Sequence, residues 1–271
     1  MAWGILCRLW AGVLGLLLVQ SAGAAPPGPL ADALALPHAS ALVGARDVPL
    51  FAWVETEAGM RNVWVGGPGR TARQLTTFTR DDGQHISDLA LSRDGSMLAF
   101  VRGGDEDMPN EGDLPNTARE ITPPRQAVAI VPTADGAQVT IGDGHSPAFS
   151  PTGDRILFAR RGEIWLWAKG GQARRVASLP GRIARLGWSP DGKRLLIAEE
   201  RGEHGFVALL DLAEPRLTYL DPGLGHSLDP TFSPDGREVA FIRTMAPPAG
   251  EVPDSGPYWS IRIVDVHTGK A

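Results

Sequence analysis

Four serines with nearly identical neighbours are the first place to look for nucleophilic chemistry in this chain. They are Ser92, Ser150, Ser189 and Ser233, in the stretches LSRDGSMLAF, FSPTGDRILF, WSPDGKRLLI and FSPDGREVAF. A catalytic serine needs a histidine as general base and a third group that orients the histidine, and such a site is built once in a domain. Because this serine occurs four times in the same setting, the pattern indicates a repeated structural device.

The Ser-Pro-Asp-Gly pattern is typical of a turn between two β-strands. Proline fixes φ at about −65°, aspartate accepts hydrogen bonds from nearby backbone, and glycine adopts the left-handed conformation. We therefore expect the serine at the end of a strand, with its hydroxyl bonded to local backbone. Two copies differ, with Arg93 in place of proline and Thr152 in place of aspartate. Both substitutions suit a turn, whereas the surroundings of a nucleophile would not vary in this way.

The spacing of the repeat predicts a β-propeller. Successive repeat serines are 58, 39 and 44 residues apart, and periods of about 40 to 45 residues are typical of four-stranded propeller blades. Around Ser189 we predict strands over 185–189, 193–200, 205–212 and 216–220. The high glycine and proline content, 33 and 23 residues, also favours many turns between short strands. The predicted fold class is therefore all-β, a propeller of four-stranded blades.

The blades are predicted near 48–80, 85–141, 145–179, 183–221 and 227–271. We expect the first blade to lack its first strand and the last blade to lack its fourth. This gives about four and a half blades of a seven- or eight-bladed propeller. Since an open blade edge invites aggregation, we expect the chain to be the front part of a longer protein.

The N-terminal residues predict export. Arg8 is followed by the apolar stretch LWAGVLGLLLVQ and by small residues before Ala25, as in a cleavable signal peptide over 1–24. A retained anchor would need about 20 apolar residues, so we expect a periplasmic or secreted protein with no stable membrane anchor after cleavage. A linker is predicted over 25–47. The single cysteine, Cys7, would leave with the signal peptide, which removes thiol chemistry from the mature chain.

Charge and histidine spacing argue against nucleic acid, metal and cofactor. The formal net charge is −5, and no run of lysine and arginine is long enough to follow a phosphate backbone. His85, His145 and His226 lie five to seven residues before a repeat serine, and this recurrent place favours a structural role. Neither H-x-x-x-H nor H-E-x-x-H occurs. We therefore expect no metal site and no cofactor.

Eight tryptophans raise the alternative of an aromatic cage or a carbohydrate platform. Five of them fall at equivalent strand positions of the repeat, where the faces of blades must pack. We expect most of these to be packing residues: Trp64, Trp165, Trp167, Trp188 and Trp259.

No serine hydrolase motif is complete in the chain. The nearest approaches to G-x-S-x-G are GHSPA (144–148) and GHSLD (225–229), and both lack the last glycine and lead into a first blade strand. The acidic pair Asp81-Asp82 could hold a cation or an amine, and for Glu199-Glu200 a solvated turn charge is the expected explanation. We therefore expect no catalytic residue in this chain.

Several longer segments resemble a known family. They are ARQLTTFTRDDGQHISDLALSRDGSMLAFVRGGD (72–105), EGDLPN (111–116), GEIWLW (162–167) and WSPDGKRLLIAEERGEHGF (188–206). In this order they look like the N-terminal propeller of secreted bacterial serine peptidases of the prolyl oligopeptidase family, in the dipeptidyl-peptidase-like branch. The Ser-Pro-Asp-Gly repeat by itself is less specific, because TolB-like propellers share it.

The resemblance implies a propeller that caps a C-terminal α/β-hydrolase domain with a Ser-Asp-His triad and gives short peptides access to it. That domain is absent from these 271 residues, so no catalytic residue can be transferred. The family implies a peptide substrate, the hydrolase domain as partner, and a homodimer as one expected assembly. Its amine-binding glutamate pair is not assigned to Glu199-Glu200, which stands in strand register.

The segment 103–125 is polar, rich in Pro, Gly and Asn, and acidic in its first half, so we predict a loop that projects from the second blade. It is either a surface excursion or a loop that faces substrate. In the second case its acidic residues are the candidates for binding the substrate amine: Asp105, Glu106, Asp107 and Glu111.

Two other functions compete with the peptidase propeller. One is a TolB-like periplasmic binding or scaffold propeller with no enzymatic activity, which also explains export and repeats. The other is a propeller lyase or glycosidase, which needs histidine, arginine and carboxylates together at one strand end. The spacing of these residues gives no sign of such a cluster.

Overall fold

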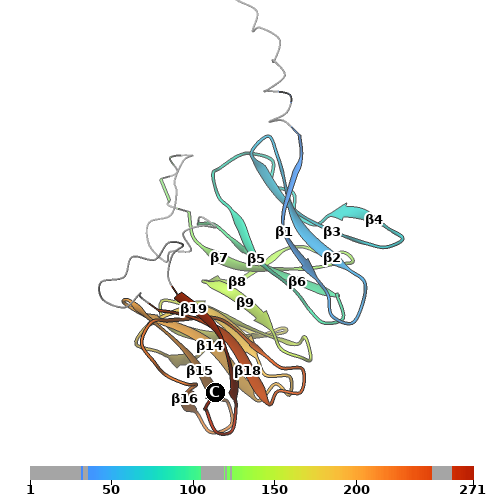
Figure 1. The fold of residues 1–271 in the computed structure, drawn as a ribbon. Coiled ribbons are helices and arrows are strands. Elements are labelled where there is room, and N and C mark those ends of the chain that lie inside the picture. Colours follow the sequence, from blue (N-terminus) through green and yellow to red (C-terminus); the bar gives the residue numbers. More distant parts are fainter. Residues whose placement is uncertain (1–31, 33–35, 105–118, 120, 123, 246–257) are drawn as a thin grey trace, which may run out of the picture. The chain divides into compact units, whose positions relative to one another are not determined.

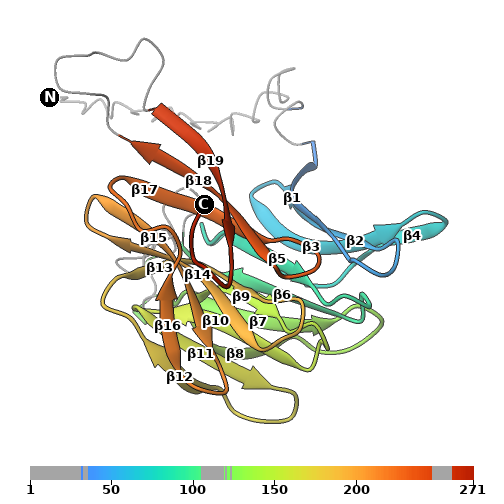
Figure 2. The same cartoon turned by 60° about the horizontal axis from the view of Figure 1, so that its bottom comes forward.

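The computed structural model describes residues 32, 36–104, 119, 121–122, 124–245 and 258–271. Within it, Leu36–Ala271 forms one compact unit. This unit contains five antiparallel sheets, each made of strands consecutive in the chain. Figure 1 and Figure 2 show these sheets, which we number as blades 1 to 5 in chain order. The predicted all-β architecture of repeated propeller blades is confirmed.

Four of the blades have four strands and the fifth has three. Blade 1 contains β1 (His38–Gly44), β2 (Phe51–Glu57), β3 (Met60–Gly67) and β4 (Arg70–Gln74). Blade 2 contains β5 (Ile86–Leu91), β6 (Met97–Arg102), β7 (Ala127–Pro132) and β8 (Val139–Asp143). Blade 3 contains β9 (His145–Phe149), β10 (Arg155–Arg160), β11 (Glu163–Ala168) and β12 (Arg174–Ser178). Blade 4 contains β13 (Arg182–Trp188), β14 (Arg194–Arg201), β15 (His204–Asp211) and β16 (Arg216–Tyr219). Blade 5 contains β17 (His226–Phe232), β18 (Glu238–Met245) and β19 (Tyr258–Asp265).

Blade 1 has a first strand, contrary to our prediction. β1 lies inside the segment 25–47 that we expected to be a linker, and it pairs with β2 from His38 opposite Thr56 to Gly44 opposite Phe51. The repeat turn is missing after β1, which is why the pattern did not reveal it. Instead the backbone N–H of Asp47 donates to the carbonyl of Arg93 in blade 2, so the connection is held by the neighbouring blade.

Apolar cores lie between consecutive blades. The second strands β6, β10 and β14 are buried runs because a neighbouring blade covers each face. In β6, Leu98 and Phe100 face the core shared with blade 1, whereas Ala99 and Val101 face the core shared with blade 3. The same arrangement recurs between blades 3 and 4 and between blades 4 and 5. Each blade is therefore stabilised mainly by the blades beside it.

Blade 5 differs in its burial. Buried and more exposed residues alternate along β18, as expected for a strand with one covered face. On β19 the side chains of Trp259, Ile261 and Ile263 are 68%, 65% and 56% exposed. Trp259, one of the five tryptophans of which we expected most to pack, therefore does not pack in a core of the described residues. Trp165 and Trp167 do pack against the core between blades 2 and 3, and Trp188 packs against the next core.

The repeat turn has the predicted structure. In blade 4, Ser189 is buried and its hydroxyl donates to the carboxylate of Asp191 at 2.5 Å, while the N–H of Arg194 donates to the same hydroxyl at 2.9 Å. The N–H of Gly192, at φ +70°, donates to the carbonyl of Ser189. These bonds join the end of one strand to the first residue of the next. The serine is thus a structural residue, as predicted.

Blade 3 achieves the same turn with a displaced carboxylate. Thr152 stands where the other copies have aspartate, and Asp154 supplies the acceptor instead. The hydroxyl of Ser150 lies 3.0 Å from the Asp154 carboxylate, and the hydroxyl of Thr152 also donates to it. These two hydrogen bonds, with that from Thr152 the stronger influence, lower the pKa of Asp154. The turn therefore needs one carboxylate within reach of the serine, at either of two sequence positions.

Candidate functional site

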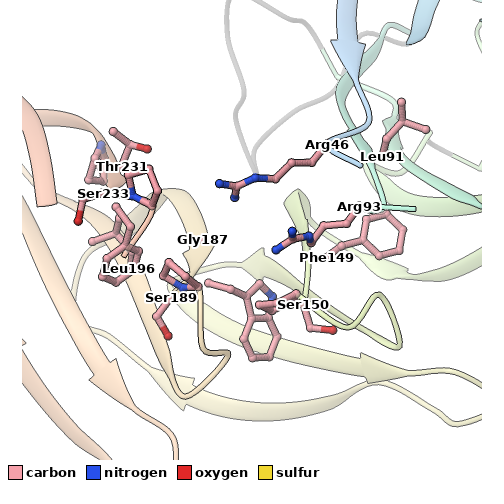
Figure 3. Close-up of a pocket in the computed structure, with 16 residues that line it drawn as sticks. Arg46, Leu91, Arg93, Phe149, Ser150, Gly187, Ser189, Leu196, Thr231 and Ser233 are labelled. Carbon is pink, nitrogen blue, oxygen red and sulfur yellow. The ribbon is translucent and has the colours of Figure 1, made fainter. Parts of the chain in front are cut away.

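The first strands of the five blades line a common cavity. β1, β5, β9, β13 and β17 are neighbours in this order, and residues at or after their C-terminal ends surround a cavity of about 390 Å³. We call it the axial mouth (Figure 3). Its wall contains the repeat serines and prolines of blades 3 to 5, together with Phe149, Trp188 and Phe232. The repeat turns therefore build the rim of this cavity.

Two arginines supply the charge of the axial mouth. Arg46 follows β1 and Arg93 follows β5, and their guanidinium groups point into the cavity in Figure 3. Arg93 is held by Asp47 in a bidentate pair, with N···O distances of 3.2 and 3.0 Å. The hydrogen bond from Arg93 lowers the pKa of Asp47, and both groups stay charged near neutral pH. The wall contains no carboxylate side chain, so the described part of the mouth is cationic.

A second cavity, of about 320 Å³, lies further back along the first strands of blades 1 to 4. We call it the axial neck. Its wall includes Asp88, Ser146 and Arg185, which each stand four residues before a repeat serine. The fourth residue of this set is Asp229, whose carboxylate lies 3.4 Å from the Arg185 guanidinium. The residues that face the axis at this level are therefore charged or polar in four consecutive blades.

β-Bulges position the residues of the axial neck. The pairing of every first strand with its second strand shifts register near this point. Asp88, Ser146 and Asp229 have positive φ values of 49°, 53° and 48°. Bulges turn side chains away from the regular alternation and are common beside functional sites. The carboxylate of Asp88 accepts the backbone N–H of Ser146 at 2.8 Å, which joins blades 2 and 3 at this level.

The contacts of Ser146 and Asp88 differ from those of a catalytic triad. Its hydroxyl lies 3.1 Å from Nδ1 of the buried His145 and 3.2 Å from the carbonyl of Ala184, to which it donates. Asp88 accepts the amide proton of Ser146 rather than a proton of the imidazole. Asp88 therefore does not take the place of the acid that orients the histidine in a triad. GHSPA stands on β9 and its approach, without a strand-to-helix elbow, as predicted from the sequence.

The structure corrects our interpretation of Glu199. We expected a solvated charge, but the side chain is fully buried on β14, where it accepts hydrogen bonds from the N–H of Gly181 at 2.8 Å and from Arg201 at 2.9 and 2.8 Å. Glu200 points away from it and pairs with Arg182. The two glutamates stand in strand register, as predicted.

Other predicted site residues have different outcomes. The candidate amine-binding residues of the loop between β6 and β7 lie outside the described residues: Asp105, Glu106, Asp107 and Glu111. Asp81 and Asp82 are paired with Arg61 and Arg102. Among the described residues, no three His, Cys, Asp or Glu side chains gather as metal ligands. In the same residues, no helix has the length and apolar character needed to cross a membrane.

Sequence reasoning missed the residues of the axial mouth and neck. The neck residues could have been found by aligning the chain on the repeat serines, since Asp88, Ser146, Arg185 and Asp229 then form one column. Arg46 carried no such signal, because blade 1 lacks the repeat turn that would have placed it.

Comparisons with known proteins agree on the fold. No protein-family model and no curated protein matches the sequence. Among solved structures, TolB from Acinetobacter baumannii matches 83% of this chain with 19% identity and a TM-score of 0.56. A prolyl endopeptidase matches 84% with 15% identity and a TM-score of 0.58. Hydrazine synthase from Kuenenia stuttgartiensis matches 84% with 15% identity and a TM-score of 0.56.

The match spans 52% of the TolB chain, 36% of the prolyl endopeptidase and 63% of the hydrazine synthase. At 15% to 19% identity the likeness to these three proteins describes architecture and leaves function to the site. With its five sheets of consecutive antiparallel strands, the chain has the β-propeller blade fold found in TolB and in prolyl endopeptidases.

Proposed function

We propose that these residues form the non-catalytic N-terminal propeller of an exported serine peptidase of the prolyl oligopeptidase family. In this proposal the axial mouth and neck admit and position short peptides for a C-terminal α/β-hydrolase domain of the same protein. The observation that carries the proposal is the lining of the axial mouth and the axial neck. Charged and aromatic side chains from all five blades line these two cavities. Among their described lining residues, no nucleophile, base and orienting acid are in contact.

Three further observations support this role. The segments 72–105, 111–116 and 188–206 resemble the family and follow one another in the same order. The apolar N-terminal stretch supports a signal peptide and a periplasmic or secreted location. The fold likeness to a prolyl endopeptidase covers 84% of this chain but only 36% of that protein, which leaves room there for a separate hydrolase domain.

A binding propeller without an enzyme is the second candidate. It is favoured by the likeness to TolB of Acinetobacter baumannii and to a putative TolB of Agrobacterium tumefaciens, with TM-scores of 0.56 and 0.53. In this case the axial mouth would bind a partner protein rather than a substrate.

The deciding experiment assays the protein expressed from its full reading frame. Chromogenic X-Pro and X-Ala dipeptides are supplied with and without a serine-directed phosphonate, and the 271-residue chain serves as the control. We expect turnover that the phosphonate abolishes and that the 271-residue chain lacks. A folded full-length protein without turnover would favour the binding propeller.

A further inference from the structure

The axial mouth combines cationic groups with a wall that offers few other hydrogen-bond donors. The hydroxyl protons of Ser189 and Ser233 are donated to the carboxylates of Asp191 and Asp235 at 2.5 and 2.6 Å. The indole N–H of Trp188 donates to the carbonyl of Ala148 at 3.0 Å. The four prolines of the wall have no N–H to donate. Beside the hydroxyl of Thr231, the guanidinium groups are therefore the principal side-chain donors that a ligand would meet.

Arg46 is available to such a ligand. Its side chain is exposed and points into the cavity, and it has no ion-pair partner among the residues that the structure describes. Arg93 uses two of its N–H groups on Asp47 and a guanidinium carries five, so donors remain on Arg93 as well. This positive site occurs in a chain of formal net charge −5.

Apolar side chains make up much of the rest of the wall. They are Phe149, Trp188, Leu196 and Phe232, together with the prolines. A ligand that matches this lining has an anionic group which only accepts hydrogen bonds, attached to an apolar body. A carboxylate is planar and matches the fork of a guanidinium. The terminal carboxylate of a peptide with an apolar last residue has this chemistry.

We propose that the axial mouth binds the C-terminal carboxylate of a short peptide, with Arg46 as the main contact and Arg93, held by Asp47, as the second. The apolar side chain of the last residue lies against Trp188 and Phe232. This inference rests on the proposed function for the choice of a peptide as ligand, and on the structure for the carboxylate. It assigns Arg46 and Arg93 to recognition of the C-terminal end of the peptide.

Binding is measured directly by calorimetry on the 271-residue chain at low salt. The probes are N-acetyl-Ala-Pro-Leu with a free carboxylate, the same peptide as its C-terminal amide, acetate and inorganic phosphate. We expect the acid to bind about tenfold more tightly than the amide, since a charge-assisted hydrogen bond is lost in the amide. Binding should weaken at about 0.5 M salt because the site is exposed and salt screens its charges.

Matched variants separate the site from general charge effects. Arg46→Gln should weaken binding of the acid about tenfold and leave binding of the amide unchanged. The double variant D47N/R93Q removes the second arginine without freeing a carboxylate, and it should also weaken binding of the acid. Arg70→Gln is the control, because Arg70 is an exposed arginine on β4 outside the cavity wall.

Equal affinity for acid and amide, no measurable binding, or unaltered binding by Arg46→Gln would overturn the inference. Tighter binding of inorganic phosphate than of the peptide acid would also overturn it in favour of a phosphate site. The outcome is separable from that of the proposed function. If the peptide acid binds more tightly than the amide but the full-length protein has no peptidase activity, the carboxylate site is supported and the proposed function is not. If the full-length protein is a peptidase but acid and amide bind equally, only the carboxylate site is contradicted.

Discussion

The phenol of Tyr219 donates a hydrogen bond of 2.9 Å to the carboxylate of Glu199, and thereby closes a buried polar cluster inside blade 4. Arg201 and the N–H of Gly181 satisfy the remaining acceptor positions of this carboxylate. Burial acts to raise the pKa of Glu199, but the hydrogen bonds from Arg201, Tyr219 and Gly181 outweigh it and lower the pKa. Burial and the same contact raise the pKa of Tyr219. Both shifts favour a charged carboxylate, held chiefly by Arg201, beside a neutral phenol.

Replacing the buried carboxylate should destabilise the fold far more than replacing its neighbour. Glu199→Gln removes the charge that pairs with Arg201 and replaces one acceptor oxygen by an NH2 donor. We expect a loss of about 2 to 3 kcal/mol in the free energy of unfolding. Glu200→Gln removes a partly exposed ion pair with Arg182, which is worth less than about 1 kcal/mol. Urea denaturation of both variants checks this, and equal losses would contradict the buried cluster.

The lowered pKa of Glu199 predicts how stability depends on pH. A carboxyl whose pKa is lower in the folded state contributes stability that is fully present above its unfolded pKa, near the ordinary value of 4.5. This contribution is lost as the pH falls through the folded pKa. The turn aspartates Asp94, Asp191 and Asp235 also have lowered pKa values, chiefly through the serine hydroxyl bonds.

Acid should therefore destabilise the protein below about pH 4.5, whereas stability should change little between about pH 5 and pH 8. Urea midpoints measured from neutral pH down to about pH 3 test this prediction. The decline should be shallower in Glu199→Gln than in the unmodified chain, and parallel declines would assign the acid sensitivity to other groups.

The repeat turn should tolerate a transfer of its carboxylate. Asp154→Ser in blade 3 removes the acceptor of both hydroxyls, and we expect a loss of about 1 kcal/mol. In the double variant T152D/D154S the carboxylate takes the place it has in blade 4, so most of this loss should be recovered. Thermal or urea denaturation of the two variants gives the comparison. A double variant less stable than the single one would mean that the two turn designs are not equivalent.

Neutralising the acidic loop should affect recognition of the substrate amine. Asn or Gln in place of Asp105, Glu106, Asp107 and Glu111 should raise KM for free-amine dipeptides in the full-length enzyme by about tenfold, with kcat little changed. N-acetylated dipeptides are the control, because they carry no charged amine. An unchanged KM for the free-amine substrates would show that the loop does not bind the substrate amine.

The turns could be predicted because their bonds lie within about six residues of sequence, from Ser189 to Arg194 for example. Glu199 could not be interpreted in this way. It stands ten residues after its repeat serine, where Arg102 and Arg243 stand after theirs, and those arginines pair with Asp82 and Asp221 at 2.7 and 3.2 Å. At this position of the repeat, blade 4 therefore has a negative side chain where blades 2 and 5 have a positive one.

Two partners of Glu199, Gly181 and Tyr219, are distant in sequence, and only Arg201 is close, so the burial of Glu199 became visible only in the fold. The axial residues were missed for a related reason. The side chains of Asp88 and Arg185 face a common axis only because five first strands are brought together, and no local pattern reports which face of a strand points there.

The repeat turns satisfy their own polar groups, since serine, carboxylate, glycine and the next strand bond to one another. Each turn is thus a self-contained unit, and such turns form the rim of the axial mouth in blades 2 to 5. Blade 3 demonstrates the freedom this gives, because it has moved its acid without altering the strands on either side. Residues in the turn of one blade could therefore be substituted to change the lining of the axial mouth, while the neighbouring blades keep their structure.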